Sequence, residues 1–457
     1  MSTLTAKLPP SPRRRQRRRI AMISTHGYVA ASPPLGAPDT GGQVVFVIEL
    51  SKQLARLGYK VDIWTRRFDK QPESEVVDEN VNILRVPCGG KDFIPKEQLY
   101  RNIPEWVENA LRLIKKQGLA YYFINSHYWD AGLAGQSLAN ALNIPHLHTP
   151  HSLGSWKKRQ MEDAAPEDKQ KLEAQFNFSA RVHHEQRLFQ ECDMVIATTP
   201  PQSDFIAADY GVPTGKIRMI PPGYDDNRFF PVSEASRQGM RTEFGYHGPV
   251  IASIGRLARN KGFDLLIKAF AIVAERLPEA KLRLAVSMQS SDPGDSRMLE
   301  ELHELVREHH LETKVIISDS LPDEQMADYY RAADVFALSS RYEPFGMTAI
   351  EALACGTPTV VTTRGGLYRA LDFGVHALYT DTEDIQEFGI SLLQALKYQR
   401  LRSRLSHQGS MRVRALFAWS GIAQQLLRAV EDRLHTDVAA PETADWSSTM
   451  WRQNVEI

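Results

Sequence analysis

The chain has 457 residues, 42% of them hydrophobic and 24% charged, and its 55 Lys and Arg residues balance its 55 Asp and Glu residues. This length is too great for one hydrophobic core and predicts two domains of about 200 residues each. The balanced charge argues against a general affinity for nucleic acid or for membranes.

The N-terminus departs from this balance, because residues 13–19 hold six arginines around Gln16. Residues 1–19 are predicted to form a solvated, basic tail. No apolar stretch of signal-peptide type follows, and no window approaches the roughly 18 apolar residues of a membrane span, so stable membrane association is not expected. Cys88, Cys192 and Cys355 lack metal-ligand spacing. They predict buried thiols and a cytoplasmic location.

In residues 20–220, short apolar runs alternate with amphipathic helical patterns, which is typical of parallel sheets built from βαβ units. Strands are predicted at residues 20–24, 61–65, 82–86, 122–125, 146–148, 194–198 and 217–220, and helices at 43–57 and 104–116. The turn-rich stretch at 221–231 is predicted to be an interdomain linker.

Residues 232–435 repeat this alternation. Strands are predicted at 250–254, 281–286, 315–318, 335–339 and 359–362, and helices at 263–276, 297–309 and 420–435. Ser420 is the expected N-cap of the last helix, for which packing back on the first domain is one expected arrangement. Residues 436–457 carry little pattern and are predicted to be a tail. The fold class is therefore α/β, with two doubly wound, Rossmann-like domains facing a central cleft.

Glu343 and Glu351 flank a Pro-Phe-Gly turn that is predicted to begin an apolar helix, with Pro344 in its first turn. The first amides of a helix lack internal partners and favour an anion such as a diphosphate. At 1.5 Å per residue, Glu351 would lie about 12 Å from Glu343. One carboxylate could then reach a sugar while the other binds a ribose. An ordinary helix with a solvated Glu would explain a lone pair, but the segment 255–262 favours a donor site.

Within that segment, Arg256 ends a predicted strand and Lys261 follows five residues later. Two cations on one loop suit a diphosphate leaving group, because Arg and Lys both bind phosphate oxygens. They would supply the stabilisation that Mg²⁺ supplies in other transferases, so neither a metal nor another cofactor is expected. Surface salt bridges are the alternative explanation.

Three segments of the first domain carry further candidates. Gly41 and Gly42, before Gln43, follow a long loop after the first strand and allow a phosphate or sugar to approach the backbone. His151 and Ser152 follow another strand and precede the basic run at 157–159, an arrangement that suits a sugar-phosphate acceptor. Histidines on such loops often only bind backbone. The remaining acceptor candidates are Lys96, Tyr128 and Arg181, of which Arg181 fits a solvated helix face equally well.

Together these motifs resemble the sucrose-phosphate synthase branch of the retaining GT-B glycosyltransferases, over nearly the whole chain from Ile20 to about Arg433. The resemblance implies transfer of a hexose, mannose from GDP-mannose, to fructose 6-phosphate with retention of configuration. It assigns the diphosphate to Arg256 and Lys261, the transferred hexose to Glu343 and the ribose to Glu351. The donor site would be completed by the amides of Phe345, Gly346 and Met347, and by Gly41, Gly42 and Gln43 at the junction with the acceptor.

The same resemblance places His151 over the transferred sugar. It also implies that the phosphorylated acceptor is bound by Lys96, Tyr128, Ser152, Lys157 and Arg181, with Gln43 next to the acceptor. A sugar phosphatase acting on the product would be a possible partner. The sequence departs from the family near Ser287 and Ser318, where glycines are usual.

Other functions share these motifs. Sucrose-phosphate synthesis from UDP-glucose, or use of ADP-glucose, fits every residue named above. From other classes, the arginine-rich tail fits a membrane-surface transferase with a lipid acceptor, and the cleft fits a non-catalytic nucleotide-sugar sensor. The pattern gives no indication of oligomeric state.

Overall fold

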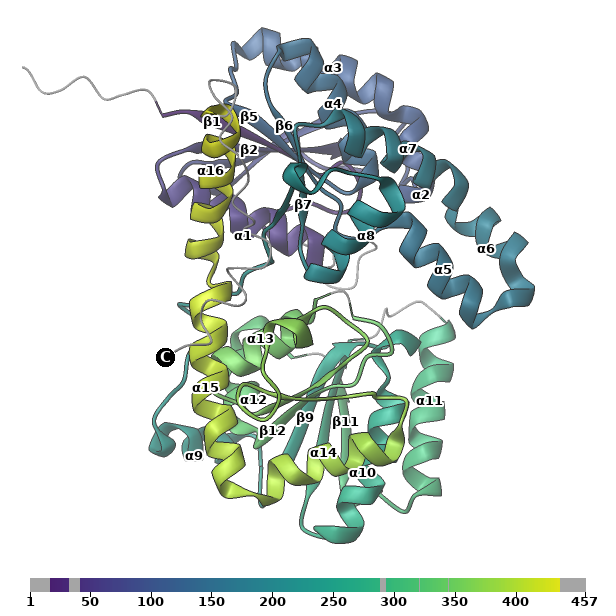
Figure 1. Ribbon diagram of the computed structural model, residues 1–457, viewed down its shortest axis with the longest axis vertical. Coiled ribbons are helices and arrows are strands. Elements are labelled where there is room, and N and C mark those ends of the chain that lie inside the picture. Colours follow the sequence, from purple (N-terminus) through teal and green to yellow (C-terminus); the bar gives the residue numbers. More distant parts are fainter. Residues whose placement is uncertain (1–16, 33–41, 288–292, 320, 344, 436–457) are drawn as a thin grey trace, which may run out of the picture.

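The computed structural model describes residues 17–32, 42–287, 293–319, 321–343 and 345–435. Figure 1 shows two lobes stacked along the long axis of the molecule, each built around its own sheet. The predicted α/β fold class is confirmed by these two doubly wound sheets. Residues 1–16 of the predicted basic tail and the predicted tail at 436–457 lie outside the described residues.

The first lobe contains an eight-stranded sheet of order β3-β4-β2-β1-β5-β6-β7-β8, in which only β3 is antiparallel to its neighbour. Its strands are β1 (Arg19–Ile23), β2 (Lys60–Arg67), β3 (Ser74–Asp78), β4 (Val81–Pro87), β5 (Phe123–His127), β6 (His146–Thr149), β7 (Met194–Ala197) and β8 (Ile217–Met219). The central strands are buried on both faces because helices cover both sides.

The first lobe also contains eight helices among the described residues. They are α1 (Gly42–Arg56), α2 (Lys96–Leu99), α3 (Ile103–Gln117), α4 (Trp129–Leu142), α5 (Gly154–Ala164), α6 (Lys169–Phe176), α7 (Phe178–Glu191) and α8 (Pro200–Tyr210). Helices α5 and α6 project from the lobe as a hairpin (Figure 1). Helix α3 shows why periodicity predicted it correctly, because Trp106, Ala110 and Ile114 form one buried stripe.

The second lobe contains a six-stranded parallel sheet of order β11-β10-β9-β12-β13-β14. Its strands are β9 (Val250–Arg256), β10 (Lys281–Ser287), β11 (Val315–Asp319), β12 (Val335–Leu338), β13 (Thr359–Thr362) and β14 (Leu378–Thr380). Its helices are α9 (Glu234–Glu243), α10 (Phe263–Arg276), α11 (Pro293–Glu308), α12 (Met326–Ala332), α13 (Met347–Ala354), α14 (Ile385–Lys397) and α15 (Gln399–Phe417). All of the predicted strands are confirmed, whereas β3 and β14 were not predicted.

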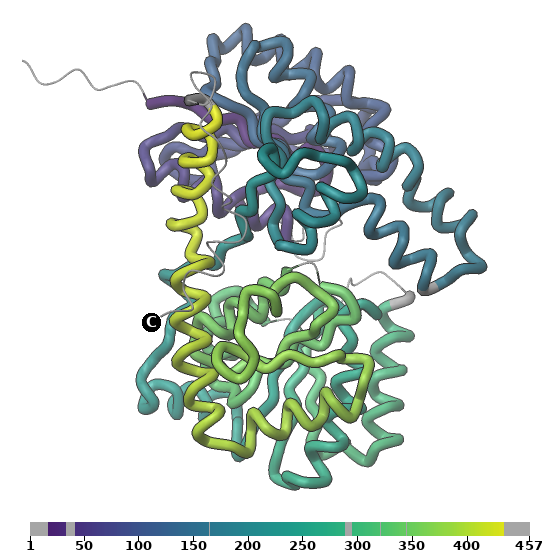
Figure 2. Tube along the Cα trace, in the orientation of Figure 1, coloured from purple at the N-terminus to yellow at the C-terminus, as the bar shows by residue number. Residues whose placement is uncertain are grey.

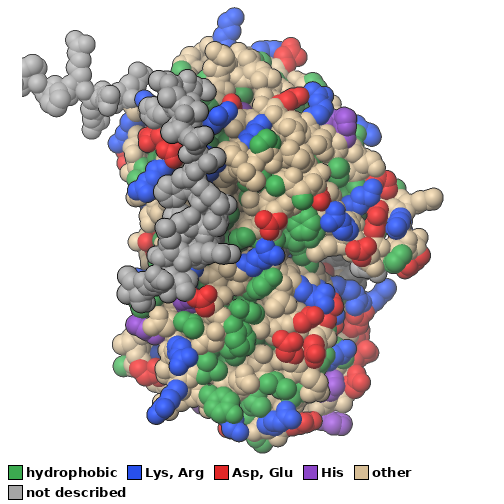
Figure 3. Space-filling view, in the orientation of Figure 1, with side chains coloured by type: hydrophobic (Ala, Val, Ile, Leu, Met, Phe, Trp, Pro, Cys, Tyr) green, Lys and Arg blue, Asp and Glu red, His purple; other side chains and the backbone are tan. Residues whose placement is uncertain are grey.

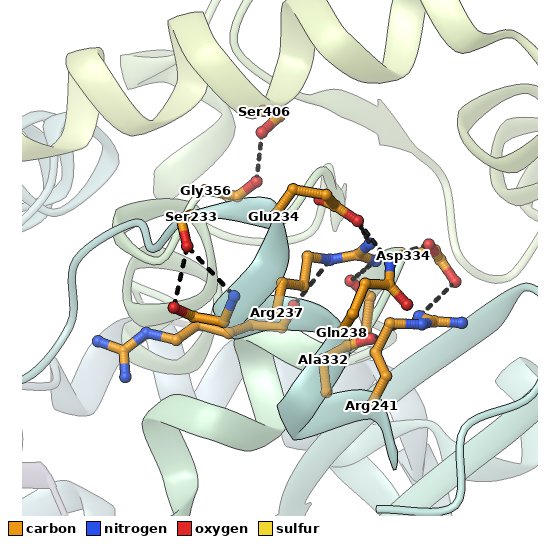
Figure 4. A network of polar contacts seen from close by, with 12 residues as sticks. Ser233, Glu234, Arg237, Gln238, Arg241, Ala332, Asp334, Gly356 and Ser406 are labelled. Atoms are coloured by element: carbon orange, nitrogen blue, oxygen red, sulfur yellow. Dashed lines mark hydrogen bonds and ion pairs between the residues drawn. The ribbon is translucent and has the colours of Figure 1, made fainter.

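The start of the second lobe is fixed by one carboxylate (Figure 4). Arg237 and Arg241 of α9 bind the two oxygens of Asp334 at 2.7 and 2.9 Å, and the Val250 amide donates to the same group at 2.9 Å. Nearby, Ser406 of α15 donates to the Gly356 carbonyl at 2.6 Å. Helices α9 and α15 therefore belong to the second lobe.

The chain crosses between the lobes twice, and the two crossings are paired. Tyr224 forms an isolated parallel bridge with Ala418, in which the Tyr224 amide donates to Phe417 at 2.8 Å and the Trp419 amide donates to Tyr224 at 3.2 Å. Helix α16 (Trp419–His435) then returns along the first lobe (Figure 2). Its Trp419, Ile422 and other apolar residues join the core that contains α1. Because this helix begins at Trp419, the prediction that Ser420 is its N-cap is wrong.

Candidate active site

Each sheet contains a switch point, where crossovers leave two neighbouring strands in opposite directions. These strand pairs are β1–β5 and β9–β12, and ligands of doubly wound folds bind beyond the carboxyl ends of such strands. Beyond the first pair lie Gln43, at the start of α1, and Tyr128, just before α4, and the second pair leads to Lys261 and Glu343. Figure 3 shows the surface hollowed where the two lobes meet, with Lys and Arg side chains at the rim.

The loop after β9 is held against the end of β12. Gly262 has φ +65°, and a Cβ there would lie 2.1 Å from the carbonyl oxygen of Ser339, so only glycine fits. The hydroxyl of Ser339 also donates to the Lys261 carbonyl at 2.8 Å. Arg256, the last residue of β9, has an exposed side chain with no ion pair among the described residues. Arg256 is therefore an open cation, whereas Arg259 of the same segment is paired with Glu301.

Lys261 and Glu343 form an ion pair. The ammonium lies 2.6 Å from Glu343 Oε2, and the Ser340 hydroxyl donates to the same oxygen at 3.2 Å. The Glu343 amide donates to the Arg364 carbonyl at 3.1 Å, which fixes the backbone beside β13. The remaining oxygen, Oε1, can accept from a sugar hydroxyl. The sequence assigned Lys261 and Glu343 to adjacent substrate groups, and the structure places them in contact.

A second carboxylate fixes the segment before Glu343. Arg341 binds Asp264 through both terminal nitrogens, at 2.7 and 2.6 Å. Burial alone would raise the pKa of Asp264, but the hydrogen bonds and charge of Arg341 lower it. The backbone between Ser339 and Glu343 is thereby anchored to α10.

Helix α13 begins later than the sequence suggested. Its first residue is Met347 and its N-cap is Gly346, with φ +100°, whereas Pro344, predicted in the first turn, lies outside the described residues. The estimated separation of Glu343 and Glu351 assumed a helix that runs through both residues, and that assumption is wrong because Glu343 lies before the helix. The amides of Phe345, Gly346 and Met347 still lie at the beginning of the helix, whereas Gly41 lies outside the described residues.

Glu351 lies inside α13 and accepts a hydrogen bond from the Tyr330 hydroxyl at 2.9 Å. Burial raises the pKa of Glu351 to about 7, against the opposing effects of Tyr330 and the positive charge of Arg228. Hydroxyl groups of a ligand that donate hydrogen bonds to such a buried carboxylate stabilise its ionised form. Tyr330 and Arg228 were not predicted, because their positions depend on α12 and the linker.

The acceptor candidates of the first lobe meet around Arg181. This side chain is 3% exposed, so its interpretation as a solvated helix face is wrong. Its guanidinium donates to Glu185 at 2.7 Å, to the Tyr128 hydroxyl at 2.8 Å, and to the carbonyl and hydroxyl of Ser152 at 2.7 and 2.9 Å. Glu185, which is fully buried, neutralises the charge. The spacing of four residues between Arg181 and Glu185 was the signal for this pair.

Lys96 lies near the same group. Burial raises the pKa of Tyr128, while the positive charges of Arg181 and Lys96 lower it, which places both cations near the phenol. Tyr128 has φ +77°, a conformation that a side chain adopts only when its surroundings hold it. The structure therefore brings Tyr128, Ser152 and Arg181 into contact, and the charge of Lys96 acts on the same phenol.

The basic run at 157–159 does not form one patch. Lys157 lies over the Phe176 ring at 4.3 Å, Lys158 is within 3.9 Å of Glu162, and Arg159 binds Asp209 at 3.0 Å. Lys158 is also 4.0 Å from Glu173, so Lys157 and Lys158 both face α6, whereas Arg159 points towards α8. Arg159 therefore does not share a cluster with the two lysines, and Lys157 stays a candidate for the acceptor.

His151 is half-buried and contacts His127, with Nε2 2.9 Å from His127 Nδ1. Burial lowers the pKa of His151 to about 3 and that of His127 well below its usual value, so both rings are neutral. His127 Nε2 is buried without a partner among the described residues, and a proton there would be an unsatisfied donor. The His127 proton therefore lies on Nδ1, and His151 carries its own on Nδ1, available for a substrate oxygen.

Gln43 connects the two strands of the first switch point. Its amide nitrogen donates to the Ser24 hydroxyl at 3.1 Å and to the His127 carbonyl at 3.2 Å. Gln43 thus holds the loop after β1 beside the histidine pair, and Gly42 begins α1 next to it.

Two family models match this chain, one for each lobe. The family model for Glycosyltransferase Family 4 matches residues 40–228, and the model for Glycosyl transferases group 1 matches residues 242–412. The mannosylfructose-phosphate synthase of Agrobacterium fabrum is 59% identical over 94% of this chain and 94% of its own length. The chain belongs to the mannosylfructose-phosphate synthase family. It is therefore a hexosyltransferase of the GT-B fold, as the sequence predicted.

More distant relatives share the same architecture. A D-inositol 3-phosphate glycosyltransferase of Corynebacterium jeikeium is 32% identical over 91% of this chain and 96% of its own length. The structure of sucrose-phosphate synthase from Thermosynechococcus elongatus matches with a TM-score of 0.77 and 30% identity, over 92% of this chain and 100% of that chain. None of the helices in the described part of this chain has the length and apolarity that a membrane span needs.

Proposed function

We propose that this protein transfers mannose from GDP-mannose to fructose 6-phosphate with retention of configuration, forming mannosylfructose phosphate. The observation that carries the proposal is the 59% identity to a mannosylfructose-phosphate synthase across both lobes. The two site halves support it, because one lobe presents a Lys–Glu pair beside an open Arg and the other presents a buried Arg that binds two hydroxyl groups.

On the donor side, Arg256 and Lys261 bind the diphosphate, together with the first amides of α13. Oε1 of Glu343 accepts from a hydroxyl of the transferred mannose, while Oε2 stays bound to Lys261 and Ser340. Glu351 accepts from the ribose hydroxyls, and the loss of solvent around it is offset by those donors.

On the acceptor side, Lys96 and Lys157 bind the phosphate of fructose 6-phosphate, and the Tyr128 and Ser152 hydroxyls orient it. Arg181 acts mainly through these groups, because it already donates to both hydroxyls. The names of two relatives include a phosphorylated sugar and a phosphorylated cyclitol, which fits a phosphorylated acceptor. A phosphatase that acts on the product is the partner this chemistry suggests.

In the reaction, the acceptor hydroxyl attacks the anomeric carbon from the face that the diphosphate leaves. The bond to the diphosphate breaks, the new glycosidic bond forms, and the hydroxyl proton passes to a leaving phosphate oxygen. Arg256 and Lys261 neutralise the charge that develops on the diphosphate, so we propose that no metal is required. The neutral His151 donates to a sugar oxygen rather than acting as the acid. The three cysteines are buried and unpaired, which favours a cytoplasmic enzyme.

A donor panel tests this proposal. Purified protein is incubated with fructose 6-phosphate and GDP-mannose, UDP-glucose or ADP-glucose, with and without excess chelator. We expect turnover of GDP-mannose that persists in chelator. Loss of all activity in chelator, restored by Mg²⁺ or Mn²⁺, would contradict the metal-independent mechanism.

Sucrose-phosphate synthesis is the second candidate, favoured by the likeness to sucrose-phosphate synthase at a TM-score of 0.77. It predicts that UDP-glucose, rather than GDP-mannose, is consumed in the same panel. Glucose and mannose differ only in configuration at C2, and the two donors also differ in their nucleotide base. The choice between the donors is therefore expected to depend on contacts to the C2 hydroxyl and to the base.

A further inference from the structure

An aromatic contact connects the two lobes beside the site. Tyr342, immediately before Glu343, packs edge-to-face on Trp156 of α5, with the ring centroids 5.2 Å apart and the planes at 81°. Trp156 is held in place within the first lobe. Its ring stacks on the Phe205 ring of α8, with the centroids 4.6 Å apart and the planes at 18°. Arg159 lies over the same Phe205 ring at 5.6 Å.

On the donor side, Tyr342 lies between two anchored residues. Arg341 is bound to Asp264 and Glu343 is bound to Lys261, so the backbone around Tyr342 has little freedom. A displacement of the Tyr342 ring therefore moves the carboxylate that we assign to the transferred sugar.

On the acceptor side, Trp156 belongs to the first turn of α5, which is bound to the Arg181 network. The Gly154 amide donates to Glu185 at 2.8 Å, and the Ser155 amide donates to Tyr210 at 3.1 Å. Glu185 in turn holds Arg181, which donates to Ser152. The positive charge of Arg181 also acts on Tyr342, opposing the rise in the Tyr342 pKa that burial and Glu343 cause.

A second contact between the lobes is an ion pair, which can be compared with the aromatic contact. Arg369 lies 3.0 Å from Asp204, but the two side chains are 44% and 72% exposed. An exposed ion pair of this kind is weak and is screened by salt, whereas aromatic edge-to-face packing is directional.

We propose that Trp156 and Tyr342 are positioning residues that couple the acceptor site to Glu343, so that nucleotide and acceptor bind cooperatively. This inference rests on the proposed function, since it takes the Arg181 group as the acceptor side and Glu343 as the donor side. Occupation of the acceptor site stabilises α5 and Trp156, and the aromatic contact then holds Tyr342 and Glu343 in place. Glu343 in turn holds Lys261, which we assign to the diphosphate, so the binding of GDP reports on this coupling.

The test is calorimetric titration of the full-length protein with GDP, in the absence and presence of saturating fructose 6-phosphate, which permits no turnover. If the donor panel identifies another nucleotide sugar, its nucleotide replaces GDP, so failure of the GDP-mannose assignment is seen separately. We expect the acceptor to tighten nucleotide binding by about fivefold, the low end of measured couplings. Absence of any coupling in the native protein would overturn the inference.

Variants then locate the coupling. Trp156→Ala and Tyr342→Ala should each reduce the ratio of the two nucleotide affinities to about 1, and the double variant should reduce it no further. Tyr342→Phe keeps the ring and should keep the coupling. Because the two alanine variants lie in different lobes, a folding defect in one leaves the other informative. Arg369→Ala is the matched control and should bind cooperatively. Unchanged coupling in both alanine variants, or equal loss in Arg369→Ala, would contradict a specific role for the aromatic pair.

Discussion

The two halves of the site are built differently. In the first lobe, Arg181 and Glu185 are 3% and 0% exposed, and the guanidinium already has hydrogen bonds to Tyr128 and Ser152. In the second lobe, Lys261 and Glu343 are 24% and 14% exposed, and Arg256 is open to solvent. The half that we propose for the acceptor is thus a pre-formed buried network, whereas the half that we propose for the donor keeps groups that a substrate can contact directly.

The difference follows from the chemistry of burial. A charge that is removed from water must be paired and hydrogen-bonded, so the Arg181 group cannot lose a member without a large loss of stability. The donor half is nearer to solvent, so its charges are available for a diphosphate and matter less for folding. Substitutions in the two halves should therefore affect different measurements.

The largest expected effect is on stability. Arg181→Met leaves Glu185 buried without its cation and should lower the free energy of unfolding by about 3–5 kcal/mol. Denaturant unfolding measures this loss, and Arg256→Met is the matched control, with almost no change expected. Combining Arg181→Met with Glu185→Leu should recover part of the loss. Equal stability of Arg181→Met and the native protein would refute the idea of a buried network.

The next effect is on catalysis. Lys261→Ala removes a cation from the diphosphate and the partner of Glu343, and should lower kcat/KM by about 10²–10³-fold, or about 2.7–4 kcal/mol. The unfolding free energy should change by less than about 1 kcal/mol, because both groups are partly solvated. Arg259→Ala is the control from the same loop, since its side chain is 72% exposed and paired with Glu301. Similar kinetics for the two variants would remove Lys261 from the site.

Glu351 should make the nucleotide affinity of the second lobe depend on pH. With its pKa at about 7, the carboxylate is ionised above that pH and neutral below it. If the ionised form binds the ribose, nucleotide affinity at pH 6 should be about tenfold weaker than at pH 8. Glu351→Gln should abolish this dependence and weaken binding by about 1.5–3 kcal/mol. His151, with a pKa of about 3, does not titrate in this range. A pH-independent affinity in the native protein would show that Glu351 is not a ribose ligand.

Glu351 should also affect how the free energy of unfolding depends on pH. Its pKa is raised from 4.5 to about 7, so the native state binds the Glu351 proton more tightly than the unfolded chain does. Stability from this group is therefore present below the unfolded pKa and falls as pH rises towards 7. Comparing the pH dependence of unfolding of native protein and Glu351→Gln checks the sign, and a rise in this window would contradict it.

The sequence predicted the strands well, because the central strands are apolar runs buried on both faces. It did not predict β3, an edge strand with the exposed residue Val76, or the depth of Arg181. Such features depend on partners far apart in the chain, such as Tyr128 and Arg181, 53 positions apart. Motifs placed Lys261 and Glu343 on one site, but only the structure shows that they bind each other. Likewise, a basic run at 157–159 says nothing about where each side chain points.

The smallest expected effect tests which residue of the proposed acceptor half binds the phosphate. Lys157 is half-buried over the Phe176 ring, while Lys158 lies near Glu162 and Glu173. If Lys157 binds the acceptor phosphate, Lys157→Ala should raise the KM for fructose 6-phosphate about tenfold, the low end for a charge-assisted contact. Lys158→Ala is the matched control and should leave this KM unchanged. Unphosphorylated fructose should be a poor acceptor for the native enzyme, and its KM should not respond to either substitution. If fructose and its 6-phosphate are used equally well, Lys157 contacts no phosphate, and recognition of the acceptor lies in the hydroxyl groups around Arg181.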